Sequence, residues 1–427
     1  GSADITATAA SVTASSFGSG ANPIGTAVSD LTVDTSASNG NQFISNGGDL
    51  TALRLNAGTG MISLSATGAL TDSDGSVDVV ASSLAISAGG DIGLDTQLGS
   101  LQAASGGSIS IANTGALVLS DLGAGYAIDN AAGDVTIDAT GALTVGADIN
   151  NGGFRTTLIA GGAIDQTGGT ITAAELVTSS TGGTTLGSTA VASLQATNAG
   201  GGAIRVANAG SLLLTDLTFL GYAVSNPAGG ISISTSLELS MEAPMTAGGS
   251  VSLTAGMALV QTGTGEVTSG GDVTFLAGTD ISLRLVDATG GVSLTATGGS
   301  IIDNNDGVVP ETLNVQAGAN STMSAGGTIG VGDCIEVNVA GTVTVSAGSQ
   351  VAGVSVDLCG TVTPSNSLII SGAPPGTVLF NGVDQAALAL LGSLLLPDHV
   401  PKAINPYLHG VVDHGLFVTP DLLKIQE

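Results

Sequence analysis

Short runs of alternating apolar and polar residues recur along most of this chain. Representative runs are Met61–Ala66 (MISLSA), Val135–Ala139 (VTIDA), Val251–Ala255 (VSLTA) and Val343–Ala347 (VTVSA). This alternation with a period of two predicts half-buried β-strands. Gly-Gly, Asn-Gly or Gly-x-Gly commonly separates the runs and predicts turns between them. No segment before residue 383 keeps a helical period.

One longer block occurs twice, at residues 106–137 and 201–233. Both copies carry Ala-Asn, then Leu-x-Leu-x-Asp-Leu, then Gly-Tyr-Ala, and Ser-Leu-Gln-Ala precedes each copy. Such self-similarity is typical of stacked repeats, in which each coil touches only its neighbours. An insertion such as Thr218-Phe219-Leu220 can therefore bulge outward without breaking the stack.

Short strands with frequent turns fit either a β-sandwich or a β-solenoid. The array is far longer than a sandwich of about 100 residues. Aromatic residues, which would pin two sheets together, are scarce: the chain has 7 Phe, 3 Tyr and no Trp. We therefore predict an all-β parallel β-helix, or β-solenoid, with about 20–25 residues per coil. Ile, Val, Leu and Ala should fill its narrow core.

Three regions differ in character. Residues 1–46 repeat poorly and predict an irregular N-terminal segment, which would be a cap or a docking end, because an open strand edge otherwise templates aggregation. Residues 47–363 carry the repeats. Residues 364–427 predict a short, partly helical C-terminal module for capping or assembly.

The C-terminal module centres on an apolar segment, residues 386–396. Asp384 can cap a helix there and Pro397 would end it. A helix that is apolar nearly all round must be buried on more than one side. The module would either cover the end of the β-helix or dock on a neighbouring subunit, and the second hypothesis gives open head-to-tail filaments. The interface residues predicted under the second hypothesis are Ala386, Leu388, Leu390, Leu391, Leu394, Leu395, Leu396, Tyr407 and Phe417.

The chain is strongly acidic, with a formal net charge of −28. It should be repelled by phosphate backbones and by anionic membranes, so no nucleic-acid partner is predicted. The apolar run at residues 386–396 is too short to cross a bilayer, so no membrane insertion is predicted. With 43% hydrophobic and 9% charged residues, the composition also argues against disorder.

Three repeat segments resemble the repeat regions of filamentous-haemagglutinin-like exoproteins, a family of large bacterial surface proteins. The segments are residues 160–173 (AGGAIDQTGGTITA), 247–273 and 270–283 (GGDVTFLAGTDISL). The resemblance implies a right-handed parallel β-helix and an extracellular protein of a surface fibre, adhesin or biofilm matrix. Such proteins usually begin with a secretion domain that carries Asn-Pro-Asn-type motifs, whereas this chain offers only Asn22-Pro23-Ile24.

The predicted function is accordingly structural. The chain would be a secreted subunit or segment of a bacterial surface fibre or adhesin, joined head to tail to further copies of itself. A host or neighbouring cell surface, or a polysaccharide, is the other expected partner. The competing hypothesis is a carbohydrate-binding or carbohydrate-cleaving β-helix protein.

Cys334 and Cys359 are the two cysteines of the chain, about one coil apart. They could lie in adjacent coils within reach of a disulfide, which a secreted protein would favour. The alternative is two small buried thiols.

Metal and cofactor chemistry finds little support. His399, His409 and His414 lie in the tail with no ligand spacing, so no metal site is predicted. Residues 72–75 and 304–307 resemble pieces of calcium loops, but neither continues to a bidentate Glu. Ordinary turns explain both segments. No cofactor is predicted, and calcium is the one alternative left.

The sequence predicts that the chain is not an enzyme. Polysaccharide-cleaving β-helices need paired carboxylates, or carboxylates with Arg or Lys, in an aromatic-lined groove. Here Arg54, Arg155, Arg205 and Arg284 stand alone in the sequence. No Gly-x-Ser-x-Gly context supports a Ser-His-Asp triad either.

Overall fold

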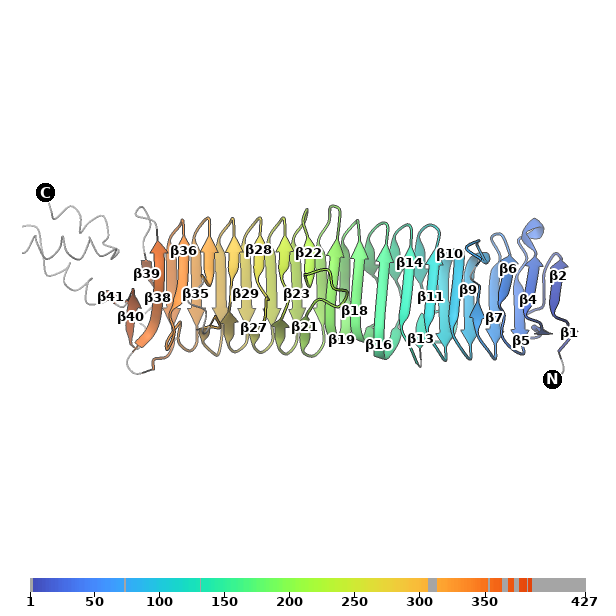
Figure 1. Ribbon diagram of the computed structural model, residues 1–427, viewed down its shortest axis with the longest axis horizontal. Helices are drawn as coiled ribbons and strands as arrows, with labels where there is room; N and C mark the ends of the chain where they lie inside the picture. Colours follow the sequence, from blue (N-terminus) through green and yellow to red (C-terminus); the bar gives the residue numbers. More distant parts are fainter. Residues whose placement is uncertain are drawn as a thin grey trace, which may run out of the picture. The chain divides into compact units, whose positions relative to one another are not determined.

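The computed structural model describes residues 3–72, 74–130, 132–305, 313–351, 354–362, 368–371, 376–381 and 383–385. The chain forms two compact units. Unit 1 is Gly1–Leu212 with Ser225–Gly229, and unit 2 is Leu213–Val224 with Gly230–Glu427. Both units are parallel β-solenoids built from short stacked strands (Figure 1), which confirms the predicted all-β parallel β-helix.

Unit 1 holds the first half of the strands and one 3-10 turn, η1 (Ser36–Ser38). Its strands are β1 (Ile5–Thr6), β2 (Ala9–Thr13), β3 (Ile24–Ala27), β4 (Asp30–Asp34), β5 (Gln42–Asn46), β6 (Ala52–Asn56), β7 (Met61–Ala66), β8 (Leu70–Thr71), β9 (Val79–Ala88), β10 (Ile92–Ser105), β11 (Ile109–Asn113), β12 (Leu117–Leu119), β13 (Ile128–Asn130), β14 (Val135–Ala139), β15 (Leu143–Val145), β16 (Ile149–Ala160), β17 (Ile164–Gln166), β18 (Ile171–Ser180), β19 (Thr184–Asn198) and β20 (Ile204–Asn208).

Two strands, β21 (Leu212–Leu214) and β22 (Val224–Asn226), lie where the units meet in sequence. Unit 2 holds β23 (Ile231–Thr235), β24 (Leu239–Met241), β25 (Met245–Ala247), β26 (Val251–Ala255), β27 (Leu259–Gln261), β28 (Val267–Ser269), β29 (Val273–Ala277), β30 (Ile281–Leu283), β31 (Val286–Ala288), β32 (Val292–Ala296), β33 (Ile301–Asp303), β34 (Val315–Ala317), β35 (Ser321–Ala325), β36 (Ile335–Val339), β37 (Val343–Ala347), β38 (Val354–Val362), β39 (Leu368–Ile370), β40 (Thr377–Phe380) and β41 (Val383–Asp384).

The core consists of like residues stacked from coil to coil. In unit 2, Leu253 lies opposite Phe275, Phe275 opposite Leu294, and Leu294 opposite Met323. All four side chains are at most 1% exposed. Burying each such side chain contributes about 1.5–3 kcal/mol. Because the side chains on a strand alternate, the residues between them point outward and are polar or half-exposed.

The length of a coil varies more than the sequence predicts. Thr51 and its hydrogen-bonding partner Ser29 one coil earlier are 22 residues apart, as expected. The corresponding separation is 17 residues between Asp78 and Asp95, and 29 residues between Ser293 and Thr322. The longest of these coils includes residues 306–312, which lie outside the described residues. Within β32 and β35, which flank the longest of these coils, the pairing keeps its register from Val292 opposite Ser321 to Ala296 opposite Ala325.

The structure differs from the sequence prediction at residues 1–46, which we expected to be irregular. In the described part of this segment, β2 already pairs in parallel with β4, which places Ala10 opposite Leu31 and Val12 opposite Val33. Strand β4 pairs with β6 in the same way. The small Ala10 and the many Ser and Thr weaken the hydrophobic contrast here, so the sequence pattern conceals a regular coil.

At the C-terminal end of the described residues, a hairpin breaks the parallel pattern. Strand β40 pairs in parallel with β38 and antiparallel with β41. Asn381, at the turn, takes a positive φ of 49°, a conformation that asparagine tolerates. The predicted helix and all the predicted interface residues of the tail lie outside the described residues. Among the residues that are described, we find no helix with the length and apolarity needed to span a bilayer.

Candidate functional site

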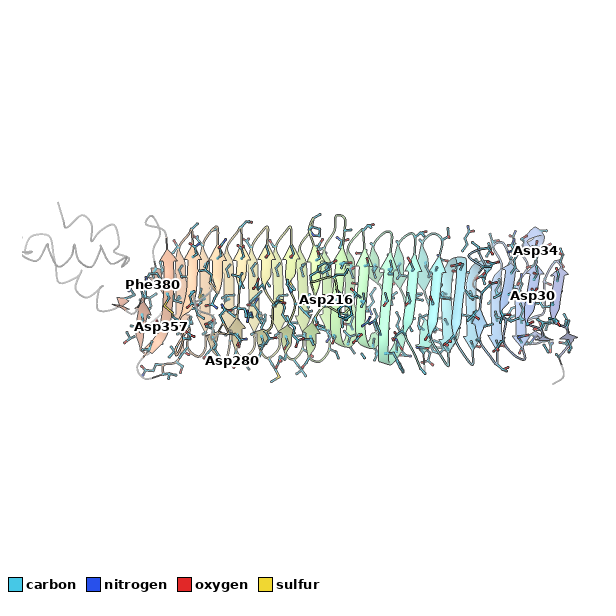
Figure 2. The ribbon with its side chains drawn as sticks, viewed as in Figure 1. Asp30, Asp34, Asp216, Asp280, Asp357 and Phe380 are labelled. Carbon is cyan, nitrogen blue, oxygen red and sulfur yellow. A yellow bond between two sulfur atoms is a disulfide. The ribbon has the colours of Figure 1, made fainter. Side chains whose placement is uncertain are left out.

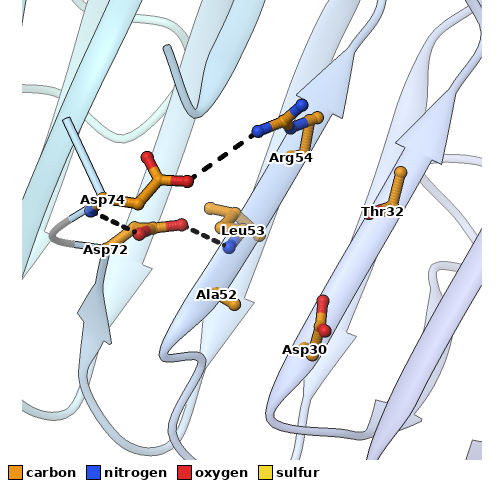
Figure 3. A pocket seen from close by; sticks show the side chains of 7 residues that line it. All are labelled: Asp30, Thr32, Ala52, Leu53, Arg54, Asp72 and Asp74. Atoms are coloured by element: carbon orange, nitrogen blue, oxygen red, sulfur yellow. Dashed lines mark hydrogen bonds and ion pairs between the residues drawn. The ribbon is translucent and has the colours of Figure 1, made fainter. Parts of the chain in front are cut away.

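A group of charged side chains surrounds a shallow cavity of about 340 Å³ on unit 1 (Figure 3). Strand β4 contributes Asp30, β6 contributes Arg54, and the turn after β8 contributes Asp72 and Asp74. Arg54 Nη2 lies 3.8 Å from Asp74 Oδ2. The remaining lining residues are Thr32, Ala52 and Leu53.

Hydrogen bonds to the surrounding chain hold the two turn carboxylates in place. Asp72 Oδ2 accepts the Leu53 N–H at 2.8 Å, and Asp72 Oδ1 accepts the Asp74 N–H at 3.1 Å. Asp74 Oδ1 accepts the Ser76 N–H at 2.7 Å and also the Ser76 hydroxyl. The Ser76 hydroxyl, with its backbone N–H, lowers the pKa of Asp74. Short polar side chains that accept nearby N–H groups are the usual chemistry of turns.

A third carboxylate, Asp78, lies beside this pair but is buried. It is 2% exposed, and its Oδ2 accepts the Asp95 N–H at 2.7 Å. Burial raises the pKa of Asp78 to about 6, and the negative charges of Asp72, Asp95 and Asp74 add to the effect. Carboxylate oxygens of Asp72, Asp74 and Asp78 lie within 4.8 Å of one another.

Three carboxylates this close could in principle hold a divalent cation or act as an acid–base pair. The contacts favour a structural role instead. Asp72 and Asp74 are engaged in closing their turn. Asp78 carries the raised pKa that a general acid needs, but it is buried and does not line the cavity. Its proton is therefore not presented to a molecule bound there.

The second segment that resembles a calcium loop, residues 304–307, is described only as far as Asn305. The Asn304 side-chain amide donates to the Gln261 carbonyl, and the Asn305 amide donates to the Arg284 carbonyl at 2.7 Å. The Asn305 amide ties the loop to the preceding coil, and the Asn304 amide ties it to the coil before that one. The sequence interpretation of an ordinary structural loop accounts for these two contacts.

Two further cavities lie among the described residues, one of about 250 Å³ on unit 1 and one of about 350 Å³ on unit 2. The first lies among Asp95, Thr96, Asn113 and Asp138, and the second among Asp272, Thr274, Ser293 and Asn320. Neither these two cavities nor the one beside Arg54 is lined by an aromatic side chain. A sugar-binding groove would need such rings for stacking, so these cavities do not favour the carbohydrate hypothesis.

Cys334 and Cys359 form a disulfide, with their Cα atoms 5.7 Å apart. Cys334 directly precedes β36 and Cys359 lies in β38, which pairs with β36. The bond therefore joins two neighbouring coils of unit 2. Asp333 and Glu336 flank Cys334 closely enough to form a three-residue group of metal-ligand type. A sulfur committed to a disulfide offers no thiolate, so this group lacks its strongest ligand.

Two arginines that stand alone in the sequence are paired in the structure. Arg155 Nη2 lies 2.6 Å from Glu175 Oε2, and the two residues are opposite each other in β16 and β18. Arg54 has the looser contact with Asp74. Both pairs join neighbouring coils at the surface, where an ion pair contributes about 0–1 kcal/mol. They are cross-coil contacts rather than a catalytic group.

The structure also shows a buried motif that our sequence analysis missed. At several places among the described residues, namely at Asn46, Asn113, Asn198 and Asn208, an Asn that ends a strand receives one hydroxyl and one N–H from the preceding coil. Asn113 Oδ1 accepts from the Thr96 hydroxyl at 3.0 Å and the Leu98 N–H at 2.8 Å. Asn208 accepts from Thr189 and Val191, both at 2.9 Å, and Asn46 from Thr26 and Val28 at 2.9 and 3.2 Å. Asn-x-Gly directly after an alternating run is the sequence signal for this motif.

The fold leaves an open strand edge on unit 1 at β2. Strand β2 pairs with β4 on one side, and within the described residues no strand pairs with its other side. Its inward residues Ala10 and Val12 are only half-buried, whereas their partners Leu31 and Val33 in β4 are 0% exposed. An edge of unpaired N–H and C=O groups with an apolar face is a template for another strand.

No protein family, no curated protein and no solved structure matched this chain in our comparisons.

Proposed function

We propose that this chain is a secreted structural protein, a subunit or segment of a bacterial surface fibre or adhesin that assembles head to tail. The observation that carries the proposal is the open edge of β2, with its half-buried Ala10 and Val12. A coil from a second copy would continue the parallel hydrogen bonding there and cover the two side chains. This mode of contact is β-strand addition, in which backbone groups supply affinity.

Other features support the same function. Every coil repeats one simple packing rule, which suits a spacer or fibre better than a site that needs unique geometry. The Cys334–Cys359 disulfide fits an oxidising, extracellular environment. The resemblance to filamentous-haemagglutinin-like repeats points to the same setting. The apolar tail of residues 386–396, by its composition, would supply the complementary end.

The proposal is tested by electron microscopy of the purified chain near neutral pH, with and without calcium. We expect long unbranched fibres. Val12→Lys places a charge at the inward, half-buried position of the open edge and should abolish them, because a buried unpaired charge is costly. The matched control is Ser11→Lys, which adds the same charge at the neighbouring outward position of β2. That variant should still form fibres.

Discrete particles from the unmodified chain would overturn head-to-tail assembly. They would favour a different occupant of the β2 edge, namely a preceding segment in a longer chain. Equal loss of fibres in both variants would show that added charge, and not the open edge, is responsible. Circular dichroism and hydrogen exchange of β4 and β6 confirm that each variant remains folded.

A further inference from the structure

An apolar knob projects from unit 2 in the loop between β21 and β22. Its tip is Phe219, which is 94% exposed, followed by Leu220, which is 55% exposed. Among the other described phenylalanines, Phe17, Phe275 and Phe380 are 8%, 0% and 2% exposed, Phe43 is half-buried, and Phe154 is 38% exposed. No other phenylalanine ring among the described residues is exposed to a comparable degree.

The knob is held in an unfavourable backbone conformation. Phe219 has a φ of 61°, whereas the other described non-glycine residues with positive φ are Asn39 and Asn381. Asparagine tolerates this region, but a bulky side chain is strained there. Asp216, at the base of the loop (Figure 2), accepts the Leu220 N–H at 2.9 Å and the Gly221 N–H at 2.7 Å, one with each carboxylate oxygen. These bonds fix the tip and keep it from collapsing onto the coil.

The duplicated block provides an internal comparison. In the first copy, one oxygen of Asp121, Oδ1, accepts the N–H groups of Gly123 at 2.7 Å and Gly125 at 2.9 Å, so the equivalent carboxylate also binds its own loop, although through a different pair of bonds. The two glycines take positive φ without strain, and no large apolar side chain stands at the tip. The loop can therefore close without Phe219 and Leu220. The first copy thus forms this loop with Gly123 and Ala124 in place of a large apolar tip.

The turns of the coils that follow the knob are acidic. Besides Asp216, the turns of the next two coils carry Glu242 and Glu266. These turns are neighbours, since the Glu242 N–H donates to the Leu214 carbonyl at 2.9 Å and the Thr264 N–H donates to the Glu242 carbonyl at 3.0 Å. The sequence has no Lys, Arg or His between Arg205 and Arg284. The tip is thus apolar, and the turns of the next two coils carry negative charge.

We propose that the Phe219–Leu220 knob is a docking element for another protein, whose site is an apolar socket rimmed by basic side chains. A convex aromatic tip fits a concave pocket, and such anchors dominate the energetics of protein interfaces. The acidic residues of these turns disfavour docking into a second copy of this chain, because the cavities of that copy are also acidic. They carry Asp95, Asp138 and Asp272. The same charge repels nucleic acid and anionic membranes. This interaction does not depend on whether the ends of the chain assemble.

The test uses Phe219→Trp, which introduces the only tryptophan of the chain. The probe is a synthetic helical peptide of about 15 Leu and Lys residues, which presents an apolar face edged by positive charge. We expect a saturable blue shift of the tryptophan emission, and binding that weakens as salt is added. By calorimetry, Phe219→Gly should lower the affinity about ten-fold or more. This variant relieves the positive φ, so its melting temperature should equal or exceed that of the unmodified chain.

The matched control is Phe154→Ala, which removes an aromatic ring that is 38% exposed on unit 1. It should leave peptide affinity unchanged. The proposal is overturned if the peptide does not bind, or if Phe219→Gly and Phe154→Ala bind it equally. It is also overturned if a Leu/Glu peptide binds as well as the Leu/Lys peptide. Blue shifts with neutral phosphatidylcholine vesicles, or on raising the protein concentration alone, would assign the knob to a membrane or to a second copy instead.

Discussion

At the scale of single residues, the buried carboxylate Asp78 should make the stability of unit 1 depend on pH. Its pKa is about 6 in the folded protein, against about 3.9 in an unfolded chain. Between these two values the folded state binds more protons, so the free energy of unfolding falls as pH rises from about 4 to about 6. Asp78→Asn keeps an oxygen to accept the Asp95 N–H but carries no charge. It should stabilise the protein near pH 7 by roughly 1–3 kcal/mol.

Denaturant unfolding at several pH values checks this expectation. The control is Asp129→Asn, which removes the same charge from an exposed position in β13. The difference in unfolding free energy between Asp78→Asn and this control should vanish below about pH 4 and grow toward pH 7. A difference that does not change with pH would contradict the assignment to Asp78.

Residue-scale features differed in how well the sequence revealed them. The cysteine pair could be placed because its separation nearly equals one coil, which is a property of the repeat. Asp78 could not be identified, because the sequence pattern does not mark the short coil of 17 residues across which it accepts the Asp95 N–H. The sequence analysis noted Asn113 and Asn208 only as part of the duplicated block, whereas the structure buries their amides between coils. A buried polar residue that bonds to the preceding coil cannot be told from a loop residue in the sequence until the pairing of the strands is known.

At the scale of elements, the Cys334–Cys359 disulfide joins the coil that contains β36 to the coil that contains β38. Closing a loop of this length constrains the unfolded chain by about 3 kcal/mol in the entropic model. Each coil contacts only its neighbours, so the effect should remain local. We expect that the double variant Cys334→Ser, Cys359→Ser exchanges amide hydrogens faster in β36 and β38. Exchange in β4 and β11 of unit 1 should not change.

Hydrogen exchange followed by mass spectrometry measures the exchange rate of each strand directly. The unmodified chain with added reductant is a second sample, and it should show the same change in exchange as the double variant. Uniformly faster exchange in both units would mean that the chain unfolds as one cooperative body, which contradicts the nearest-neighbour expectation. Unchanged exchange in β36 and β38 would mean that the coil pairing there is sufficient without the covalent link.

The alternating pattern predicted strands well where the inward residues are large. Val251, Leu253 and Ala255 repeat almost unchanged in later coils, and the structure stacks them in register. The pattern failed at β2, where small and polar residues conceal the same geometry. A period-two pattern reflects the contrast between apolar and polar side chains, and it does not report the backbone conformation directly. The regular pairing of β2 with β4 therefore corrects the prediction of an irregular segment at residues 1–46.

At the scale of the whole molecule, the net charge of −28 bears on the proposed fibre. Two such chains repel each other, and the repulsion acts over about 30 Å at 0.01 M salt but only about 10 Å at 0.1 M. Docking at the β2 edge is apolar and backbone-mediated, so it should not weaken as salt is added. We therefore expect the sedimentable fraction to increase when sodium chloride is raised from about 0.01 M to about 0.1 M.

Calcium chloride at the same ionic strength is the matched comparison, because the carboxylates of the surface could be bridged by a divalent ion. Equal effects of the two salts would mean that screening alone governs assembly. A larger effect of calcium would point to bridging between copies. A decrease in fibres with added sodium chloride would contradict the apolar mechanism, because it would mean that opposite charges hold the copies together. Lys402 and Lys424, the two lysines of the chain, would then be the positive groups to substitute first, since both lie in the C-terminal module.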